Sequence, residues 1–448
     1  MKNIAKMFLC LLFLLFSCSD MIQDLRLPGT PNYTFDSETI LHASDMKTID
    51  EFGKSVGISG KYAIVGAWYE DGGEGDPLNS TGAAYIFERN SSGVWEEAAL
   101  LHASDMQADD YFGHTVSING NYGIVGAYQE DGGEGDPASS AGAAYIFERN
   151  SSGIWGETAI LHASDMQLGD GFGYSVSISG SYAIVGAWEE DGGIGNPATA
   201  AGGAYIFERN SSGVWEEAAQ LHASDMQAGD HFGGSVSITG SYAIVGAYQE
   251  DGGPGNPETG AGATYIFERN SFGVWEETAL LHASDMQAID SFGHTIALSG
   301  NYAIVGAYGE DGGESDPVTD AGSAYIFERD SNGNWSQQAI LQASDMQFDD
   351  RFGMCVAIDG NYAIVDAHWE DGGIGDPVSG AGAAYIYKRN NSGVWEELNI
   401  LHASDMQPYD YFGKSIAINN GKVIISAYYE DGGEGDPASE AGAVYIYE

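Results

Sequence analysis

Apolar and polar positions along this chain follow a pattern with a long period. Four strand-like runs stand out within residues 101–160: "HTVSI" (114–118), "YGIVGAY" (122–128), "GAAYIFE" (142–148) and "IWGETAIL" (154–161). The first alternates apolar with small or polar side chains, and the second is a continuous apolar run typical of a doubly buried strand. Short turns join the first run to the second and the third to the fourth. The segment therefore predicts a four-stranded antiparallel unit.

The unit recurs every 60 residues without insertion or deletion, as the phrase "EDGG" shows at residues 70, 130, 190, 250, 310, 370 and 430. Sevenfold repetition of a four-stranded unit is typical of β-propellers, where each repeat is one blade. Long segments join the second strand to the third and the fourth strand to the next first strand. Because successive connections of an up-and-down blade alternate between its faces, we expect all long segments on one face, here called the long-loop face.

The two ends of the repeat array predict how the ring closes. The chain ends at "GAVYIYE" (442–448), a third strand with no fourth strand after it. Residues 33–41 align instead with a fourth strand, and Phe35 takes the place of Trp95. An open array would leave two sheet edges exposed, whereas a shared blade leaves none. We predict an all-β fold: one seven-bladed β-propeller of four-stranded antiparallel blades over residues 33–448, with the N-terminal strand completing the C-terminal blade.

The N-terminus has the pattern of a targeting segment. Lys2 and Lys6 precede the apolar run "MFLCLLFLLF", which is too short for a convincing membrane span. The residues "LFSC" ending at Cys18 resemble a bacterial lipobox, so we predict a lipoprotein-type signal peptide at 1–17, lipidation of Cys18 and a tether at 18–32. The protein would then be anchored in the outer membrane or at the cell surface; ordinary cleavage and secretion is the alternative. Beyond Cys18 only Cys355 remains, so the mature domain is expected to have no internal disulfide.

Composition narrows the class of partner. The 448 residues are 43% hydrophobic, which is ample for a large core, and 66 acidic against 16 basic residues give a formal charge of −50. Nucleic-acid binding requires a basic surface and is therefore excluded. An acidic surface instead suits divalent cations or cationic partners.

Two recurrent motifs resemble the FG-GAP repeat of integrin α-subunit propellers and their bacterial relatives. The "FG" half is matched by Phe52-Gly53, Phe112-Gly113, Phe172-Gly173, Phe232-Gly233, Phe292-Gly293, Phe352-Gly353 and Phe412-Gly413. The "GA" half is matched by Gly66-Ala67, Gly126-Ala127, Gly186-Ala187, Gly246-Ala247 and Gly306-Ala307. The last two repeats depart with Asp366 and Ser426, and Trp, Tyr or His replaces the family's proline throughout.

The resemblance implies a propeller, but one family feature does not transfer. Integrin-type repeats often carry a DxDxDG calcium loop in the first hairpin, and here that hairpin is a short turn such as "SGKY". A lone Asp359 in one of these turns cannot supply the six to eight oxygens that calcium takes. The family's usual metal site is therefore expected to be absent.

The "EDGGxG[DN]P" segments are the candidate calcium sites. Carboxylates crowded on one face repel, and a divalent ion would offset that repulsion. The alternative is turn chemistry, because Asp binds backbone amides and Gly accepts positive φ. Asp45, Asp50 and their equivalents in the fourth-to-first loops would add oxygens. The predicted ligands are Glu70, Asp71, Asp76, Glu130, Asp131, Asp136, Glu190, Asp191, Asn196, Glu250, Asp251, Asn256, Glu310, Asp311, Asp316, Glu370, Asp371, Asp376, Glu430, Asp431 and Asp436.

Other recurrent residues favour structural roles. Histidine recurs at 42, 102, 162, 222, 282 and 402, but Gln342 stands at the equivalent position, so a common catalytic or ligand role is excluded. The tryptophans are expected to anchor the core or the blade interfaces; they are Trp95, Trp155, Trp215, Trp275, Trp335 and Trp395.

Catalysis needs one asymmetric constellation of groups, and no catalytic motif is recognisable in these near-identical repeats. We therefore expect a non-enzymatic binding or adhesion propeller, monomeric, with a protein or glycan ligand on the long-loop face and a lipid anchor as its only link to a membrane. The alternatives are a lectin with a sugar pocket between each pair of blades and a purely structural envelope protein. Residues just before each Phe-Gly pair differ between blades, which favours a single asymmetric contact; they include Tyr111, Gly171, His231, Ser291, Arg351 and Tyr411.

Overall fold

A computed structural model describes residues 33–72, 79–133, 138–193, 195, 197–253, 258–312, 318–373, 377–432 and 438–448. The predicted signal peptide, Cys18 and the whole of the predicted tether lie outside these residues. Every regular element within the described ranges is a β-strand, and no helix there could cross a membrane. The residues from Phe35 to Glu448 form one compact unit.

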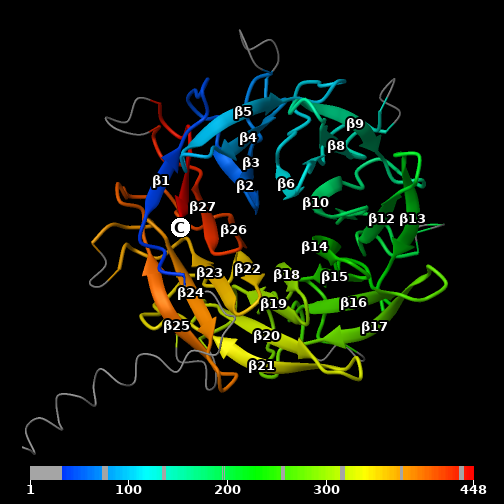
Figure 1. Ribbon diagram of the computed structural model, residues 1–448. Coiled ribbons are helices and arrows are strands. Elements are labelled where there is room, and N and C mark those ends of the chain that lie inside the picture. Colours follow the sequence, from blue (N-terminus) through cyan, green and yellow to red (C-terminus); the bar gives the residue numbers. More distant parts are fainter. Residues whose placement is uncertain are drawn as a thin grey trace, which may run out of the picture. The chain divides into compact units, whose positions relative to one another are not determined.

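Seven four-stranded antiparallel sheets surround a central axis as the blades of a propeller (Figure 1). Blades 1 to 3 contain β2(Phe52–Ser59), β3(Tyr62–Ala67), β4(Ala83–Arg89), β5(Trp95–Leu101); β6(Thr115–Asn119), β7(Tyr122–Ala127), β8(Ala143–Arg149), β9(Trp155–Leu161); and β10(Phe172–Ser179), β11(Tyr182–Ala187), β12(Gly203–Arg209), β13(Trp215–Leu221). Blades 4 to 6 contain β14(Phe232–Thr239), β15(Tyr242–Ala247), β16(Ala263–Arg269), β17(Trp275–Leu281); β18(Thr295–Ser299), β19(Tyr302–Ala307), β20(Ser323–Arg329), β21(Trp335–Leu341); and β22(Val356–Asp359), β23(Tyr362–Ala367), β24(Ala383–Arg389), β25(Trp395–Leu401). Blade 7 contains β26(Ile416–Asn419), β27(Lys422–Ala427), β28(Ala443–Tyr447) and β1(Glu38–Leu41). The fold class predicted from the repeat is confirmed, and the strand bounds of blade 2 differ from those predicted by at most one residue.

The shared blade closes the ring as predicted. Its strand order is β1-β28-β27-β26, and β1 pairs antiparallel with β28 from Glu38↔Tyr447 to Leu41↔Val444. Figure 1 shows the blue N-terminal strand beside the red C-terminal strands. A second link joins blade 1 to blade 7, where the Arg89 guanidinium lies 2.6 Å from the Glu448 carboxylate. The closure therefore leaves no blade short of a strand.

The core lies between neighbouring blades. Phe112 is fully buried and meets the rings of Tyr145 and Phe147 edge-on at 5.3 and 5.9 Å. Farther out, Trp155 of blade 2 packs edge-on against Tyr62 of blade 1 at 5.7 Å. The same pair recurs around the ring as Trp215–Tyr122, Trp275–Tyr182 and Trp395–Tyr302, and at the closure Phe35 packs against Tyr362. The predicted role of these tryptophans as core or interface anchors is confirmed, and Phe35, which aligns with Trp95 in the sequence, makes the equivalent contact at the closure.

The glycines of the two recurrent motifs face each other across five of the seven blade interfaces. A Cβ added to Gly66 would lie 1.9 Å from the carbonyl oxygen of Gly113, so neither blade can approach this closely with a larger residue at position 66. Asp366 and Ser426 occupy the equivalent positions in blades 6 and 7. There the Asp366 carboxylate accepts the Cys355 amide hydrogen at 2.5 Å, and the Ser426 hydroxyl accepts that of Ser415 at 3.0 Å.

The first strands of all seven blades surround a central channel of about 370 Å³. Valine and isoleucine alternate with serine along its wall, as Val116, Ser117 and Ile118 illustrate. Backbone amides in this wall bond to serine hydroxyls of the neighbouring blade; Ile178 N–H, for example, donates to Ser117 Oγ at 3.3 Å. Hydrogen bonds therefore link the first strands of neighbouring blades around the channel.

Candidate functional site

Both kinds of long loop meet on the predicted long-loop face. In blade 1 the amide of Phe112, in the loop that follows β5, donates to the carbonyl of Thr81, in the loop before β4, at 2.9 Å. The Tyr85 hydroxyl of β4 donates to Asp45 of the loop that follows β1 at 2.8 Å. The arrangement of loops on this face agrees with the prediction from the strand order.

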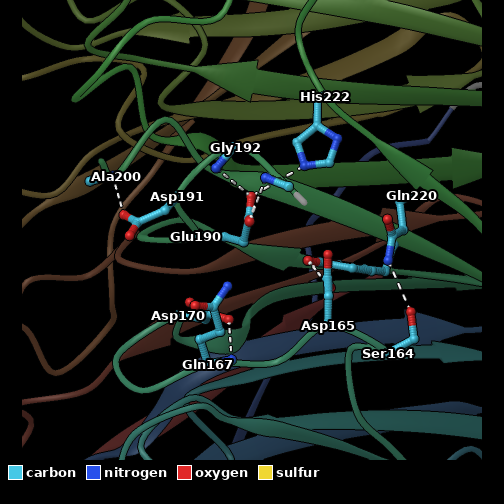
Figure 2. Close-up of polar contacts among 12 residues, drawn as sticks. Ser164, Asp165, Gln167, Asp170, Glu190, Asp191, Gly192, Ala200, Gln220 and His222 are labelled. Carbon is cyan, nitrogen blue, oxygen red and sulfur yellow. Dashed lines mark hydrogen bonds and ion pairs between the residues drawn. The ribbon is translucent and has the colours of Figure 1, made fainter. Parts of the chain in front are cut away.

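The first acidic residue of each "EDGG" phrase points inward rather than to solvent. In blade 3 the Glu190 carboxylate is 1% exposed and accepts the amide hydrogens of Gly192 and Gly193 at 2.9 and 2.6 Å (Figure 2). The imidazole Nε2 of His222 lies 3.2 Å from the same carboxylate. These bonds lower the pKa of Glu190 even though burial opposes that change. The carboxylate thus stabilises the start of the loop.

The second acidic residue closes the far end of the same loop. Asp191 Oδ1 accepts the amide hydrogen of Ala200 at 3.0 Å (Figure 2), and the equivalent bond occurs in all seven blades at 2.8–3.0 Å. A glutamate at one end and an aspartate at the other therefore bring the two ends of each acidic loop together. This is the turn chemistry that the sequence offered as the alternative to calcium binding.

The third predicted ligand of each loop lies outside the described residues. These are Asp76, Asp136, Asn196, Asn256, Asp316, Asp376 and Asp436. Within the part of the chain that the structure describes, no three His, Cys, Asp or Glu side chains are grouped so that they could hold a metal ion. Calcium binding by the acidic loops stays a prediction.

The recurrent histidines support the acidic loops. His102 lies 3.2 Å from Glu70, and His42, His162, His222 and His402 lie near the equivalent glutamates. In blade 5 the loop glutamate is Glu310, which accepts a hydrogen bond from the Ser323 hydroxyl at 2.5 Å, and Gln342 donates to that hydroxyl at 3.3 Å. A serine and a glutamine thus replace one histidine, which explains why the exchange is tolerated.

The aspartates of the fourth-to-first loops also face the protein interior. Asp170 accepts the Gln167 amide hydrogen at 2.6 Å, and Asp165 accepts the Tyr205 hydroxyl at 2.9 Å (Figure 2). Burial raises the pKa of Asp170 and Asp230 to about 6. It raises the pKa of the equivalent residues to about 7; these are Asp50, Asp110, Asp290, Asp350 and Asp410.

Aromatic side chains form a circle on the long-loop face. They were not among the predicted site residues. The residue after each Gly-Ala pair, or its equivalent, is aromatic in every blade: Trp68, Tyr128, Trp188, Tyr248, Tyr308, His368 and Tyr428. Rings from the start of a blade fill the spaces between them. Tyr174 lies 5.7 Å from Tyr128 of the preceding blade and 4.7 Å from Trp188 of its own, and His294 lies 5.4 Å from Tyr248 and 4.8 Å from Tyr308 in the same way. We call this arrangement the aromatic circle, to distinguish it from the rings of single side chains.

The aromatic circle has many more aromatic side chains on one side than on the other. Blades 6, 7 and 1 carry a second aromatic residue directly after the first, whereas Gln129, Glu189, Gln249 and Gly309 occupy that position in the other blades. Tyr409, Tyr411 and Tyr111 add three more rings from the loops that lead into blades 7 and 2. We call the group formed by Trp68, Tyr69, Tyr111, Trp369, Tyr409, Tyr411, Tyr428 and Tyr429 the aromatic patch.

Members of the aromatic patch form two groups of contacting rings, one around Trp68 and one around Tyr411, and they reach solvent. Ring centroids lie 4.1 Å apart in Tyr428–Tyr429 and 4.2 Å apart in Trp68–Tyr69. Tyr411 links Trp369 at 5.4 Å to Tyr429 at 5.5 Å. Trp369 is 39% and Tyr409 58% exposed, while the other members are half-buried. The patch therefore offers several partly exposed ring faces close together.

Basic side chains lie within the aromatic patch. The Lys54 ammonium is 4.1 Å from the ring centroid of Trp68 and 5.8 Å from that of Tyr428, and the Arg351 guanidinium is 4.8 Å from that of Trp369. Burial and the charge of the nearby Lys414 lower the pKa of Lys54 to about 8. Positive charge is thus concentrated at this part of an otherwise acidic protein.

One signal for this surface was present in the sequence. Trp, Tyr or His replaces the family's proline in all seven repeats, and these seven residues are the ones that form the aromatic circle. The variation before each Phe-Gly pair marked Tyr111, His231, Arg351 and Tyr411, which the structure brings to the same face. The density of the patch was also readable, because the predicted closure makes blades 6, 7 and 1 neighbours and only these blades have a second aromatic residue after the first.

The comparison with protein families agrees with this architecture. The family model described as FG-GAP repeat matches residues 35–87, 95–147, 155–207, 215–267, 275–327, 335–387 and 395–447. No curated protein matches the chain. Among solved structures, a protein from Lactobacillus plantarum is similar with 11% identity and a TM-score of 0.48, over 80% of this chain and 85% of that one.

Proposed function

The chain belongs to the FG-GAP repeat family, and from this premise we propose that it is a non-enzymatic binding propeller of the bacterial cell envelope. Its ligand, a glycan or a protein, lies across the aromatic patch of the long-loop face. The observation that carries this proposal is the departure from sevenfold symmetry: the blades share one frame, but partly exposed Tyr and Trp side chains gather on blades 6, 7 and 1. Tyr and Trp dominate binding hot spots because each offers a large apolar face and a polar group.

Binding is favoured over catalysis by what the polar groups already do. Carboxylates that recur in every blade, such as Glu190, Asp191 and Asp170, accept hydrogen bonds from nearby backbone amides. The patch contributes rings, hydroxyls and a few cations, which orient and hold a ligand. A purely structural envelope protein would gain nothing from Trp369 and Tyr409 in solvent, since burial of apolar area is what stabilises a fold.

Attachment to the envelope through a lipid on Cys18 is part of the proposal. Its support is the sequence alone, because residues 1–32 lie outside the described ranges. The Cys18→Ala variant should leave the membrane fraction or accumulate unprocessed, whereas Cys355→Ala should fractionate like the wild type. Unchanged membrane association of the Cys18 variant would show that another segment anchors the protein.

The binding proposal is tested with a library of immobilised glycans and purified envelope proteins. A Trp369→Ala/Tyr411→Ala variant should lose the binding that the wild type shows. The matched control is Gln249→Ala/Ser291→Ala, which changes the same two repeat positions on blades 4 and 5 and should bind like the wild type. If the patch variant retains full binding of every ligand found, the proposed site is wrong.

A further inference from the structure

Two lysines near the aromatic patch, Lys54 and Lys414, lack the ion pairs that five arginines form at the blade interfaces. Arg89, Arg149, Arg209, Arg269 and Arg389 each lie within 3.5 Å of a glutamate at a blade interface. Lys54 and Lys414 are half-buried at equivalent positions of neighbouring blades 1 and 7, and neither forms an ion pair with a described residue.

Glu51 and Asp366 act on these lysines through their charge but form their hydrogen bonds with other groups. Glu51 is 4% exposed and accepts the Trp68 indole N–H at 2.6 Å. Asp366 is fully buried, accepts the amide of Cys355 and lies 2.8 Å from Nδ1 of His368. The Lys54 ammonium lies over the rings of Trp68 and Tyr428, and Lys414 is near enough for its charge to act on Lys54. Burial lowers the pKa of both lysines. An anionic group placed between them would relieve their repulsion.

The surroundings limit how much negative charge a ligand can carry. The whole chain has a formal charge of −50, and seven acidic loops lie on the same face as the patch. A polyanion would meet strong repulsion from that rim, whereas one carboxylate at the two lysines would not. The remainder of the ligand is thus expected to be neutral.

The rings of the patch match a ligand made of sugars. Six of its eight members are tyrosines, so apolar ring faces alternate with hydroxyl groups across the surface. A pyranose ring has the same character, with C–H groups on its faces and hydroxyls at its edge. Aromatic faces carry partial negative charge and attract such C–H groups, while phenolic hydroxyls bond to sugar hydroxyls.

We propose that the aromatic patch binds an oligosaccharide with a single acidic sugar, a uronic or nonulosonic acid, whose carboxylate lies between Lys54 and Lys414 while adjoining neutral sugars stack on the tyrosine and tryptophan rings. This inference rests on the proposed function and names the ligand class of the same site. The acidic sugar fixes the position of the ligand, and the neutral sugars supply most of the contact area.

The test uses the full mature chain and a printed library in which every glycan with one uronic or nonulosonic acid stands beside its methyl ester. Free glucuronic acid and free N-acetylneuraminic acid serve as soluble competitors, which separates recognition of a glycan from capture of a free acid. We expect retention on one or more acidic glycans, at least tenfold weaker retention on the ester, and little competition by the free acids.

Variants then assign the carboxylate to the lysines. Lys54→Gln and Lys414→Gln should each weaken binding of the acidic glycan about tenfold, as expected for loss of a charge-assisted contact, and leave binding of the ester unchanged. Lys61→Gln is the matched control, because Lys61 lies in the turn between β2 and β3 on the opposite face and is 53% exposed. Melting temperatures of all three variants show whether each one folds.

The outcomes separate this inference from the proposed function. Equal binding of acids and esters, binding of neutral glycans only, or no glycan binding at all would overturn the inference. If the ligand is then a neutral glycan or an envelope protein that needs Trp369 and Tyr411, the proposed function stands. If no binding depends on the patch, both fall.

Discussion

Single residues explain why the two recurrent motifs are needed together. Each Gly of a Gly-Ala pair gives room to the carbonyl of the Gly in the next blade's Phe-Gly pair, and the Phe fills the interface beside it. This close approach brings the loop before each Phe-Gly pair onto the preceding blade, where Tyr111 reaches Trp68 at 5.1 Å. The two motifs together therefore both build the core and position the side chains of the aromatic circle.

Gly186→Ala tests the contact between the motifs. A Cβ at this position would lie 2.0 Å from the carbonyl oxygen of Gly233, so the blades must move apart. We expect a loss of about 1–3 kcal/mol or more in the free energy of unfolding, measured by urea denaturation. Gly156→Ala in β9 is the control, since nothing lies within 4 Å of its added Cβ. Equal stability of the two variants would contradict the proposed role of the motif.

The buried aspartates predict how stability depends on pH. Burial raises the pKa of Asp110 to about 7 in the folded protein, above its value near 3.9 in an unfolded chain. Between these values the folded state holds more protons than the unfolded state, so the free energy of unfolding falls as pH rises from about 4 to 7. With seven such residues, the melting temperature should be higher at pH 5.5 than at pH 8.

Asp110→Asn separates this effect from general charge repulsion. The amide oxygen can still accept the Gln107 amide hydrogen that Asp110 accepts at 2.7 Å, but the side chain no longer titrates. The variant should therefore lose less stability than the wild type between pH 5.5 and pH 8. Identical slopes for both proteins would assign the pH dependence to the overall charge of the chain.

Among the strands, β1 has only four residues, yet it completes the blade that closes the propeller. It supplies the outer strand of blade 7 and carries Leu41 into the core, while Phe35 before it packs against Tyr362 of blade 6. Without it, β28 would expose a row of unpaired backbone groups.

Removal of β1 tests the closure. A chain that begins at residue 42 should melt at a markedly lower temperature than one that begins at residue 33, or aggregate through the exposed edge of β28. The two chains differ only in residues 33–41, so the comparison needs no point substitution. Equal melting temperatures would mean that β1 contributes nothing to ring closure.

At the scale of the whole molecule, the sevenfold repeat predicts the fold, but residues that recur in every blade do not indicate a single asymmetric site. Strand positions, blade number and closure could be predicted because each is repeated seven times or follows from alignment of the two ends. The inward orientation of Glu190 and Asp170 could not, since it depends on backbone amides that only the folded loop presents. The aromatic patch depends on ring closure, which brings Tyr429 at the end of the chain close to Lys54 and Trp68 at its beginning.

Calcium binding is a prediction about all seven acidic loops together. If calcium binds only the folded state, it should increase the free energy of unfolding by about 2.7 kcal/mol per site at a hundredfold excess over Kd. Millimolar calcium chloride should therefore raise the melting temperature. Sodium chloride of equal ionic strength is the control, because screening also relieves repulsion. The loops with Asn196 and Asn256 carry one charge fewer and should bind most weakly. Equal stabilisation by both salts, without a calcium heat in calorimetry, would leave the loops as turns only.

The most direct test of the account is the stoichiometry of ligand binding by isothermal titration calorimetry, with a ligand identified in the library. An asymmetric site on blades 6, 7 and 1 predicts one ligand per chain, with affinity reduced by Tyr69→Ala, Trp369→Ala or Tyr429→Ala. The equivalent Gln129→Ala and Gln249→Ala variants should bind like the wild type. About seven ligands per chain, with equal losses at every equivalent position, would instead show a lectin with repeated pockets and contradict the single aromatic site.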